Sequence, residues 1–140
     1  MAYQSINPFT NQKLKDYPPH TDEHIQNALD QAEQILKSDW PQQIDQRIKV
    51  LRNVAQKLRE QKTELAKLMT LDMGKLIKQS EGEIESCAKI AEYFADHAKE
   101  FLAPVSYETE LGEAWVEHHP LGIVMAVEPW NFPFYQLMRV

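Results

Sequence analysis

Apolar residues recur at helical spacing through most of the first hundred positions of the chain. The clearest stripe predicts a helix that ends before Pro104, and its members are Ile84, Cys87, Ala88, Ala91, Phe94, Ala95, Ala98, Phe101 and Leu102. Shorter stripes over 25–36, 44–58 and 65–69 predict three earlier helices. We therefore expect the larger part of the chain to be helical.

Residues beside these stripes indicate where the helices begin and end. Thr21 is expected to cap the first helix, and Pro41 fits the opening of the second. Gly74 fits the C-terminal end of the third helix. Ser80 and Glu83 match a capping box, in which Ser80 caps the fourth helix and Glu83 reaches back to the backbone N–H of Ser80.

Strand-forming residues occupy the two ends of the chain. Segments 5–8 and 14–17 predict two short extended pieces around an asparagine-containing turn. Segments 107–110 and 114–117 carry strand formers among polar residues. The continuous apolar run over 122–127 suits a strand that is covered on both faces.

A last apolar segment follows this run, and its members are Phe134, Tyr135, Leu137, Met138 and Val140. They suit the start of a helix, and an apolar face at this point would have nothing to pack on. We therefore expect a truncated piece of a longer protein. Helices followed by strands, and then by a buried strand that leads into a helix, predict the front part of an α/β fold.

Composition argues against several classes of protein. The 140 residues carry a net charge of −6, which argues against nucleic acid and anionic lipid as partners. The single cysteine, Cys87, excludes an internal disulfide and fits a reducing compartment. No apolar run reaches the roughly eighteen residues of a membrane span, and the N-terminus lacks the features of a secretory signal. We expect a cytoplasmic protein.

The sequence offers few candidates for a nucleophile or a metal site. Cys87 lies on the apolar stripe with no histidine within one turn, so we expect a buried and inert thiol. His118 and His119 are adjacent in a strand-like segment, point to opposite faces and cannot chelate a metal together. No metal site is expected. Three acidic residues are expected to cap and solvate a helix, namely Glu81, Glu83 and Glu85.

The segment from Pro129 to Pro133, with the sequence PWNFP, combines rigidity with a polar side chain. Its two prolines stiffen a strand-to-helix turn and remove two backbone donors. The amide of Asn131 would be held firmly there, and its NH₂ group can donate to developing negative charge. Ligands of parallel α/β sheets bind at the carboxyl ends of strands, where this turn lies. A rigid turn in which Trp130 serves only packing explains the same residues equally well.

The segment Leu121–Pro133, with the sequence LGIVMAVEPWNFP, closely resembles the aldehyde dehydrogenase family at the first strand of its dinucleotide-binding domain. Ile6–Asn11 resembles the family's opening segment, with asparagine where its last residue is usually glycine, and Leu71–Lys75 resembles one of its helix ends. These matches follow the family's order along the chain. Glu117–Gly122 together with Val127–Pro129 is most similar to the succinate-semialdehyde dehydrogenase branch.

This resemblance implies an α/β fold in which residues 1–140 are the N-terminal part of a Rossmann-like cofactor-binding domain, without the catalytic domain. Segment 107–120 would belong to the β-hairpin through which the family forms homodimers or homotetramers. The implied activity is oxidation of an aldehyde, here succinate semialdehyde, to the carboxylic acid with NAD or NADP. A non-enzymatic helical interaction or oligomerisation module is the alternative.

The resemblance also implies roles for three residues. Asn131 matches the asparagine whose amide holds the oxyanion formed when a cysteine thiolate attacks the aldehyde, and Trp130 and Asn131 match positions that line the cofactor. Arg139 matches an arginine that binds the remote carboxylate of acid semialdehydes, and it follows Asn131 by about two helical turns, so both can face one cavity. The catalytic cysteine and glutamate belong to family motifs outside this chain, so we expect residues 1–140 alone to be inactive.

Overall fold

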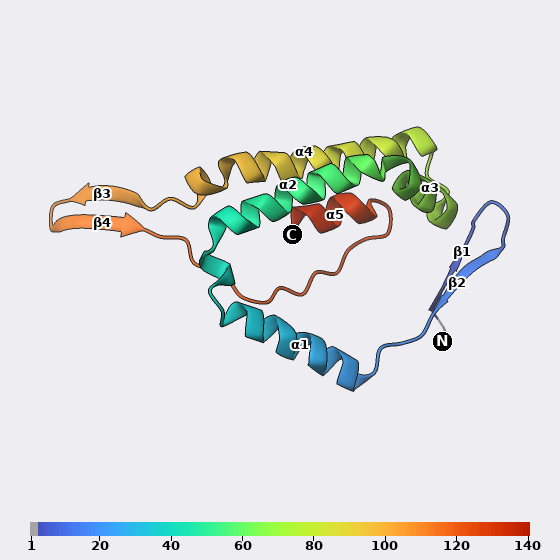
Figure 1. Ribbon diagram of the computed structural model, residues 1–140, viewed down its shortest axis with the longest axis horizontal. Coiled ribbons are helices and arrows are strands. Elements are labelled where there is room, and N and C mark those ends of the chain that lie inside the picture. The colour runs from blue at the N-terminus through green and yellow to red at the C-terminus, as the bar shows by residue number, and fades with distance from the viewer. Residues whose placement is uncertain (1–2) are drawn as a thin grey trace.

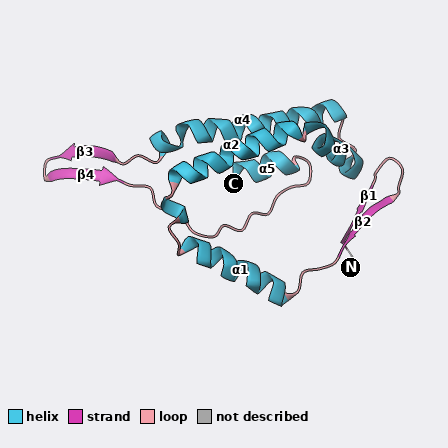
Figure 2. Cartoon of the chain, in the orientation of Figure 1, coloured by secondary structure: helices cyan, strands magenta, loops and turns pink. Residues whose placement is uncertain are grey.

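The computed structural model describes residues 3–140, most of which are helical (Figure 1, Figure 2). The helices are α1 (Asp22–Leu36), α2 (Ile44–Glu60), α3 (Lys62–Met73), α4 (Ile77–Phe101) and α5 (Pro133–Arg139). The strands form two separate antiparallel hairpins, β1 (Tyr3–Ile6) with β2 (Lys13–Tyr17) and β3 (Val105–Thr109) with β4 (Gly112–Val116). The helices and hairpins expected from the sequence are confirmed. Within residues 3–140, no helix has both the length and the apolarity that crossing a membrane requires.

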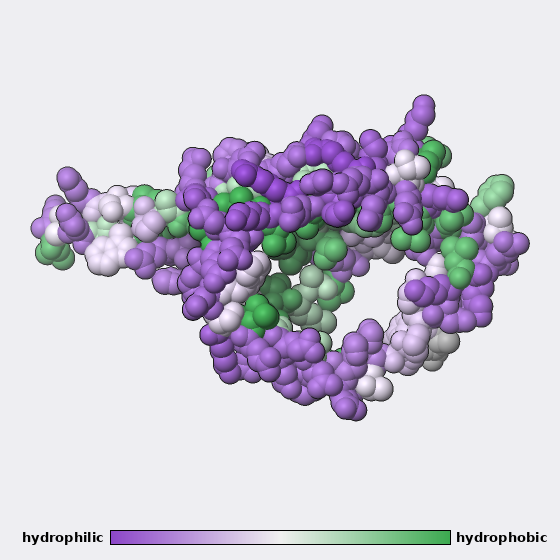
Figure 3. Space-filling view, in the orientation of Figure 1, coloured by the Kyte–Doolittle hydropathy of each residue, from purple (hydrophilic) through white to green (hydrophobic). Residues whose placement is uncertain are grey.

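α2, α4 and α5 share a small core. α2 packs along α4, and the buried side chains of Ala55, Ala88 and Ala91 let the two helix backbones approach each other closely. Leu58 of α2 and Met138 of α5 pack against this cluster. Polar side chains cover the outer face of the bundle, and apolar ones gather on the side towards α1 and the segment that leads to α5 (Figure 3). The core therefore attaches α5 to two helices that are distant in sequence.

α1 lies apart from this core, and none of its residues is buried (Figure 1). Thr21 caps it as expected, because the Thr21 hydroxyl accepts a hydrogen bond from the backbone N–H of His24 at 3.2 Å. The apolar stripe of α1 stays half exposed, at 49% for Ile25 and 55% for Ile35. Amphipathic patterning thus predicts the helix correctly, although the described residues provide little for its apolar face to pack on.

The predicted capping box at Ser80 and Glu83 is wrong. α4 begins at Ile77, so both residues lie inside the helix, and both are buried. The backbone N–H of Ser80 donates to the carbonyl of Leu76 at 3.0 Å, as in a continuing helix. The carboxylate of Glu83 contacts Lys75 and the start of α5 instead of returning to Ser80. Glu83 therefore neither caps α4 nor faces solvent.

The predicted strand over 122–127 is not formed in the described residues. A strand needs a hydrogen-bonded neighbour, and the described sheets are only the two hairpins. The segment runs as a loop from β4 to α5 (Figure 1), with Met125 exposed by 88% and Val127 by 80%. Pro41 also differs from expectation, because it opens a 3₁₀ turn over Trp40–Gln42, and α2 begins only at Ile44.

Gly74 generates a prediction about stability. It ends α3 in the left-handed conformation, with φ of 75°, and a Cβ added there would lie 3.2 Å from Cγ of Pro8. Because this conformation costs a residue with a Cβ about 1–2 kcal/mol, we expect Gly74→Ala to lower the free energy of unfolding by about that amount. Urea unfolding followed by circular dichroism at 222 nm measures the change.

Gly82 provides the matched control. It lies within α4, and no atom is within 4 Å of a Cβ added there. Gly82→Ala should therefore raise the free energy of unfolding by about 0.5–1 kcal/mol, as alanine does within a helix. Destabilisation of the same size in both variants would contradict the conformational argument for Gly74.

Candidate functional site

The turn before α5 leaves two side chains of the PWNFP segment open to solvent. Trp130 is 74% exposed, and Asn131 next to it is also exposed. Pro133 occupies the first turn of α5, where a missing backbone N–H costs no helical hydrogen bond. Trp130 thus does not serve as buried packing within the described residues, and the Asn131 amide is free to meet a ligand.

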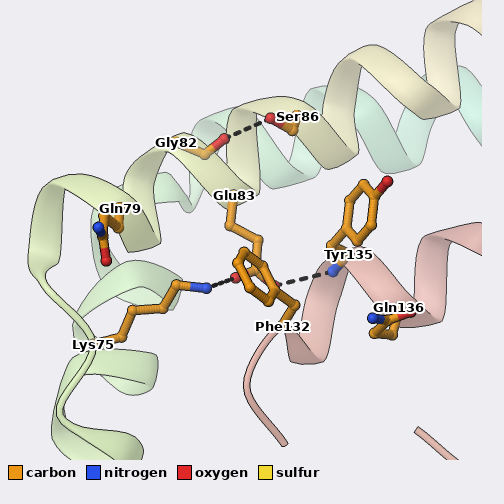
Figure 4. Close-up of a pocket in the computed structure, with 8 residues that line it drawn as sticks. All are labelled: Lys75, Gln79, Gly82, Glu83, Ser86, Phe132, Tyr135 and Gln136. Atoms are coloured by element: carbon orange, nitrogen blue, oxygen red, sulfur yellow. Dashed lines mark hydrogen bonds and ion pairs between the residues drawn. The ribbon is translucent and has the colours of Figure 1, made fainter. Parts of the chain in front are cut away.

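A buried ion pair lies directly behind this turn. The ammonium of Lys75 and the carboxylate of Glu83 are in contact, and their side chains are exposed by only 8% and 1%. Lys75 follows the left-handed Gly74 at the end of α3, and Glu83 lies two turns into α4. Figure 4 shows the two side chains meeting beneath the ring of Phe132.

The carboxylate of Glu83 holds the start of α5. One of its oxygens, Oε1, accepts hydrogen bonds from the backbone N–H groups of Phe134 and Tyr135, each at 3.0 Å. The first N–H groups of a helix lack partners within the helix, and negative charge is favourable at this end. Glu83 therefore satisfies two donors of α5 from a position on α4 that is distant in sequence.

The ammonium of Lys75 holds the turn itself. Nζ donates to the backbone carbonyl of Asn131 at 3.0 Å and lies 3.5 Å from the centre of the Phe132 ring. A cation over an aromatic face is attracted by the ring's charge distribution. Together with Glu83, Lys75 thus fixes the chain on both sides of the Phe132–Pro133 step.

The ion pair is a part of the site that the sequence reasoning missed. Glu83 was expected to be a capping and solvated residue because S-x-x-E is a common helix start. The sequence nevertheless contains a signal that Glu83 is buried. Ser80, Glu83 and Cys87 share one helix face at spacings of three and four residues, and Cys87 is expected to lie in the core. Lys75 also belongs to the LDMGK segment that resembles the family.

The ion pair and the turn line the same cavity. It measures about 680 Å³, and α4 and α5 form opposite walls (Figure 4). Its lining residues are Lys75, Gln79, Gly82, Glu83, Ser86, Phe132, Tyr135 and Gln136. Asn131 contacts Lys75 through its backbone carbonyl, and the residue itself is exposed.

Arg139 occupies the last residue of α5, which confirms that a helix separates it from Asn131. Its guanidinium lies 5.7 Å from the ring of Tyr135, and it lines a cavity of about 510 Å³ that also includes Trp40 and Met138. Asn131 is not among the lining residues of that cavity. A common cavity for Asn131 and Arg139 therefore stays a prediction.

The surroundings of Cys87 and of the histidines are not those of a catalytic nucleophile or a metal centre. Cys87 is completely buried, as expected, and burial together with the nearby Glu83 carboxylate raises the pKa of its thiol to about 11. His119 lies 3.3 Å from a carboxylate oxygen of Glu117. Across residues 3–140, no three His, Cys, Asp or Glu side chains converge on a point where they could hold a metal ion.

Comparison with known proteins decides the family of this chain. The model of the aldehyde dehydrogenase family matches residues 1–140, which is the whole sequence. The chain belongs to the aldehyde dehydrogenase family. The resemblance found in the PWNFP segment is therefore confirmed, and so is the expected α/β class, because solved members superimpose on the entire chain.

Relatives of this aldehyde dehydrogenase chain carry consistent names. It is 37% identical over 139 residues to the probable succinate-semialdehyde dehydrogenase [NADP(+)] of Synechocystis sp., covering 99% of this chain and 31% of that protein. It is 35% identical over 138 residues to the succinate-semialdehyde dehydrogenase [NADP(+)] of Deinococcus radiodurans, covering 98% and 29%. The chain thus spans about 30% of the length of these relatives.

Solved structures agree with these relatives. The succinic semialdehyde dehydrogenase of Streptococcus pyogenes, solved in complex with NADP⁺, superimposes with a TM-score of 0.95 at 42% identity. The superposition covers 99% of this chain and 31% of the solved one. The arrangement of helices, hairpins and PWNFP turn is therefore that of the corresponding region in the family.

The burial of Cys87 gives a prediction about thiol chemistry. Because the folded pKa is about 11 and the ordinary value is 9.0, native Cys87 should react with a thiol reagent such as DTNB far more slowly than the unfolded chain at pH 8. Between these two pKa values the unfolded state releases its proton first, so the free energy of unfolding should fall as pH rises from about 9 to about 11. Rapid stoichiometric labelling of the folded protein at pH 8 would refute this assignment.

Proposed function

We propose that this chain is the N-terminal portion of an NAD(P)-dependent aldehyde dehydrogenase that oxidises succinate semialdehyde to the carboxylic acid. The observation that carries the proposal is Asn131, an exposed amide in a rigid PWNFP turn of a chain that belongs to this family. The names of the Synechocystis, Deinococcus and Streptococcus relatives support the substrate. Family membership over the whole chain does not favour the alternative of a non-enzymatic interaction module.

In the proposed reaction, Asn131 acts on charge that develops at the aldehyde oxygen. Attack of a thiolate on the aldehyde carbon turns the carbonyl oxygen into an oxyanion, and the Asn131 NH₂ group donates a hydrogen bond to it. A donor held in place before the reaction stabilises such charge without the cost of reorganisation. The attacking cysteine and the glutamate that activates water would come from segments outside residues 1–140.

Trp130 and Asn131 are proposed to contact the cofactor. The exposed indole of Trp130 offers an N–H donor and a flat apolar face, and the Asn131 amide can pair with a ribose hydroxyl, so these residues fit a dinucleotide. When bound, NAD⁺ or NADP⁺ supplies the hydride acceptor. The relatives named for NADP(+), and the Streptococcus complex with NADP⁺, favour NADP as the cofactor.

The β3–β4 hairpin is proposed to serve assembly. It projects away from the bundle (Figure 1), and its side chains are exposed, including Tyr107 at 55% and Trp115 at 62%. Exposed aromatic residues on an unpaired edge favour pairing with a second copy. We propose a homodimer or homotetramer in the cytoplasm that takes an aldehyde substrate and no nucleic-acid or membrane partner.

The role of Asn131 can be tested in the full-length enzyme. Removal of one oxyanion donor lowers kcat by about 100- to 1,000-fold in comparable enzymes, and we expect Asn131→Ala to do the same. The dissociation constant for NADP⁺ should change far less than kcat, because the oxyanion exists only during the reaction, whereas the proposed ribose contact is one ordinary hydrogen bond worth about 0.5–1.5 kcal/mol. Asn53→Ala, which removes an exposed asparagine of α2, is the matched control. An unchanged kcat, with the chemical step shown to be rate-limiting, would exclude the role.

Arg139 is tested by comparing two aldehydes. A guanidinium pairs with a carboxylate through two parallel charge-assisted hydrogen bonds. Arg139→Ala should therefore lower kcat/KM for succinate semialdehyde by a factor of about 30–1,000, mainly through KM, and should spare butanal. Arg52→Ala, which removes an exposed arginine of α2, controls for a general loss of positive charge. Equal losses for the two aldehydes would show that Arg139 is structural.

A further inference from the structure

We propose that Lys75 and Glu83 are positioning residues for Asn131, and that this buried ion pair sets the direction of the oxyanion-holding amide. The inference rests on the proposed function of Asn131. Neither residue offers its charged group to a substrate, because their side chains are exposed by only 8% and 1%. They act on the reaction through the backbone of the turn.

The geometry of the backbone contacts carries the argument. Lys75 Nζ binds the carbonyl oxygen of Asn131 at 3.0 Å, which fixes the peptide plane that follows Asn131. Glu83 Oε1 binds the N–H groups of Phe134 and Tyr135 at 3.0 Å each, which fixes the first turn of α5. Only the Phe132–Pro133 step lies between these points, and the ring of Pro133 locks one of its backbone dihedrals. The chain that follows Asn131 is thus held against α4.

The side chain of Asn131 is left out of this network. Within residues 3–140, the hydrogen bond that involves Asn131 uses its backbone carbonyl, and its amide remains exposed. Such an arrangement suits a hydrogen-bond donor whose position must be fixed while its NH₂ group stays unpaired and available to a ligand. A misplacement of about 1 Å in a reacting group can cost about a hundredfold in rate.

Two features separate this role from simple stabilisation of α5. A neutral side chain could cap a short helix, whereas burial of two charges carries a desolvation cost that apolar packing would avoid. Lys75 also binds the residue proposed to do chemistry, and it contacts the adjacent Phe132 ring at 3.5 Å. A fixed geometry is what such a pair contributes in return.

Kinetics of the full-length enzyme test the inference. We expect Lys75→Met and Glu83→Ala to lower kcat by about 10- to 100-fold, which is a smaller loss than that expected for Asn131→Ala. KM for succinate semialdehyde should change less than about threefold, because Arg139, not the oxyanion donor, is proposed to bind its carboxylate. Glu83→Gln keeps an acceptor for the α5 N–H groups, so its kcat should lie between that of the wild type and that of Glu83→Ala.

A double-mutant cycle distinguishes positioning of Asn131 from a purely structural role, because only positioning makes the loss of kcat depend on the presence of Asn131. In an Asn131→Ala background, Lys75→Met and Glu83→Gln should cause almost no further loss of kcat, because the group that they position is gone. Lys99→Met breaks the exposed pair of Lys99 and Asp45 at 2.7 Å between α4 and α2, and it should leave kcat unchanged in both backgrounds. If Lys75→Met or Glu83→Ala does not fold, the near-isosteric Glu83→Gln alone decides the cycle.

The possible outcomes separate this inference from the proposed function. Losses of kcat that are the same in the wild-type and Asn131→Ala backgrounds would overturn the positioning role and leave the dehydrogenase assignment intact. If the wild-type enzyme does not oxidise succinate semialdehyde when supplied with either NAD⁺ or NADP⁺, the proposed function is overturned, and the positioning role with it. Loss of kcat confined to the background that retains Asn131, with nearly unchanged KM, would establish the role.

Discussion

The buried pair of Lys75 and Glu83 is the interaction on which the position of α5 depends. α5 has only seven residues, too few for an isolated helix to be stable in water. Its apolar attachment to the core is modest, with Met138 packed against three alanines. The two N–H groups taken by Glu83 and the carbonyl taken by Lys75 supply the directional part of the attachment. Because removal of one partner would leave a buried charge uncompensated, at a cost of about 3–5 kcal/mol, the two residues act as one unit.

Local backbone chemistry places this unit. Gly74 adopts the left-handed conformation that ends α3, and α4 begins only three residues later at Ile77. This short connection brings Lys75 beside the first two turns of α4, where Glu83 lies. Pro133 contributes from the other side, because its lack of an N–H leaves Phe134 and Tyr135 as the first donors of α5. A glycine and a proline thus decide which charges meet which backbone groups.

Features that depend on neighbouring residues could be predicted from the sequence. The helical stripes, the Thr21 cap, the Gly74 stop and both hairpins follow from periodicity and local hydrogen bonding. The strand over 122–127 could not be predicted in the same way, because a strand exists only with a partner, and none is present among the described residues. The role of Glu83 could not be predicted either, because it depends on residues that are distant in sequence. Its local pattern fits a capping box, but its partners at Phe134 and Tyr135 are 51 and 52 residues away.

The candidate site follows the same division. Asn131 could be identified from its two flanking prolines and from the family's PWNFP segment, since both are properties of the local sequence. How Asn131 is held could not, because the groups that hold it belong to the junction of α3 and α4, 56 residues earlier for Lys75. In this turn the described hydrogen bonds to Lys75 and Glu83 engage backbone groups, while the Trp130 indole and the Asn131 amide remain exposed. A donor that is fixed through its own backbone keeps its side chain unpaired, and an unpaired, oriented amide is what stabilisation of an oxyanion requires.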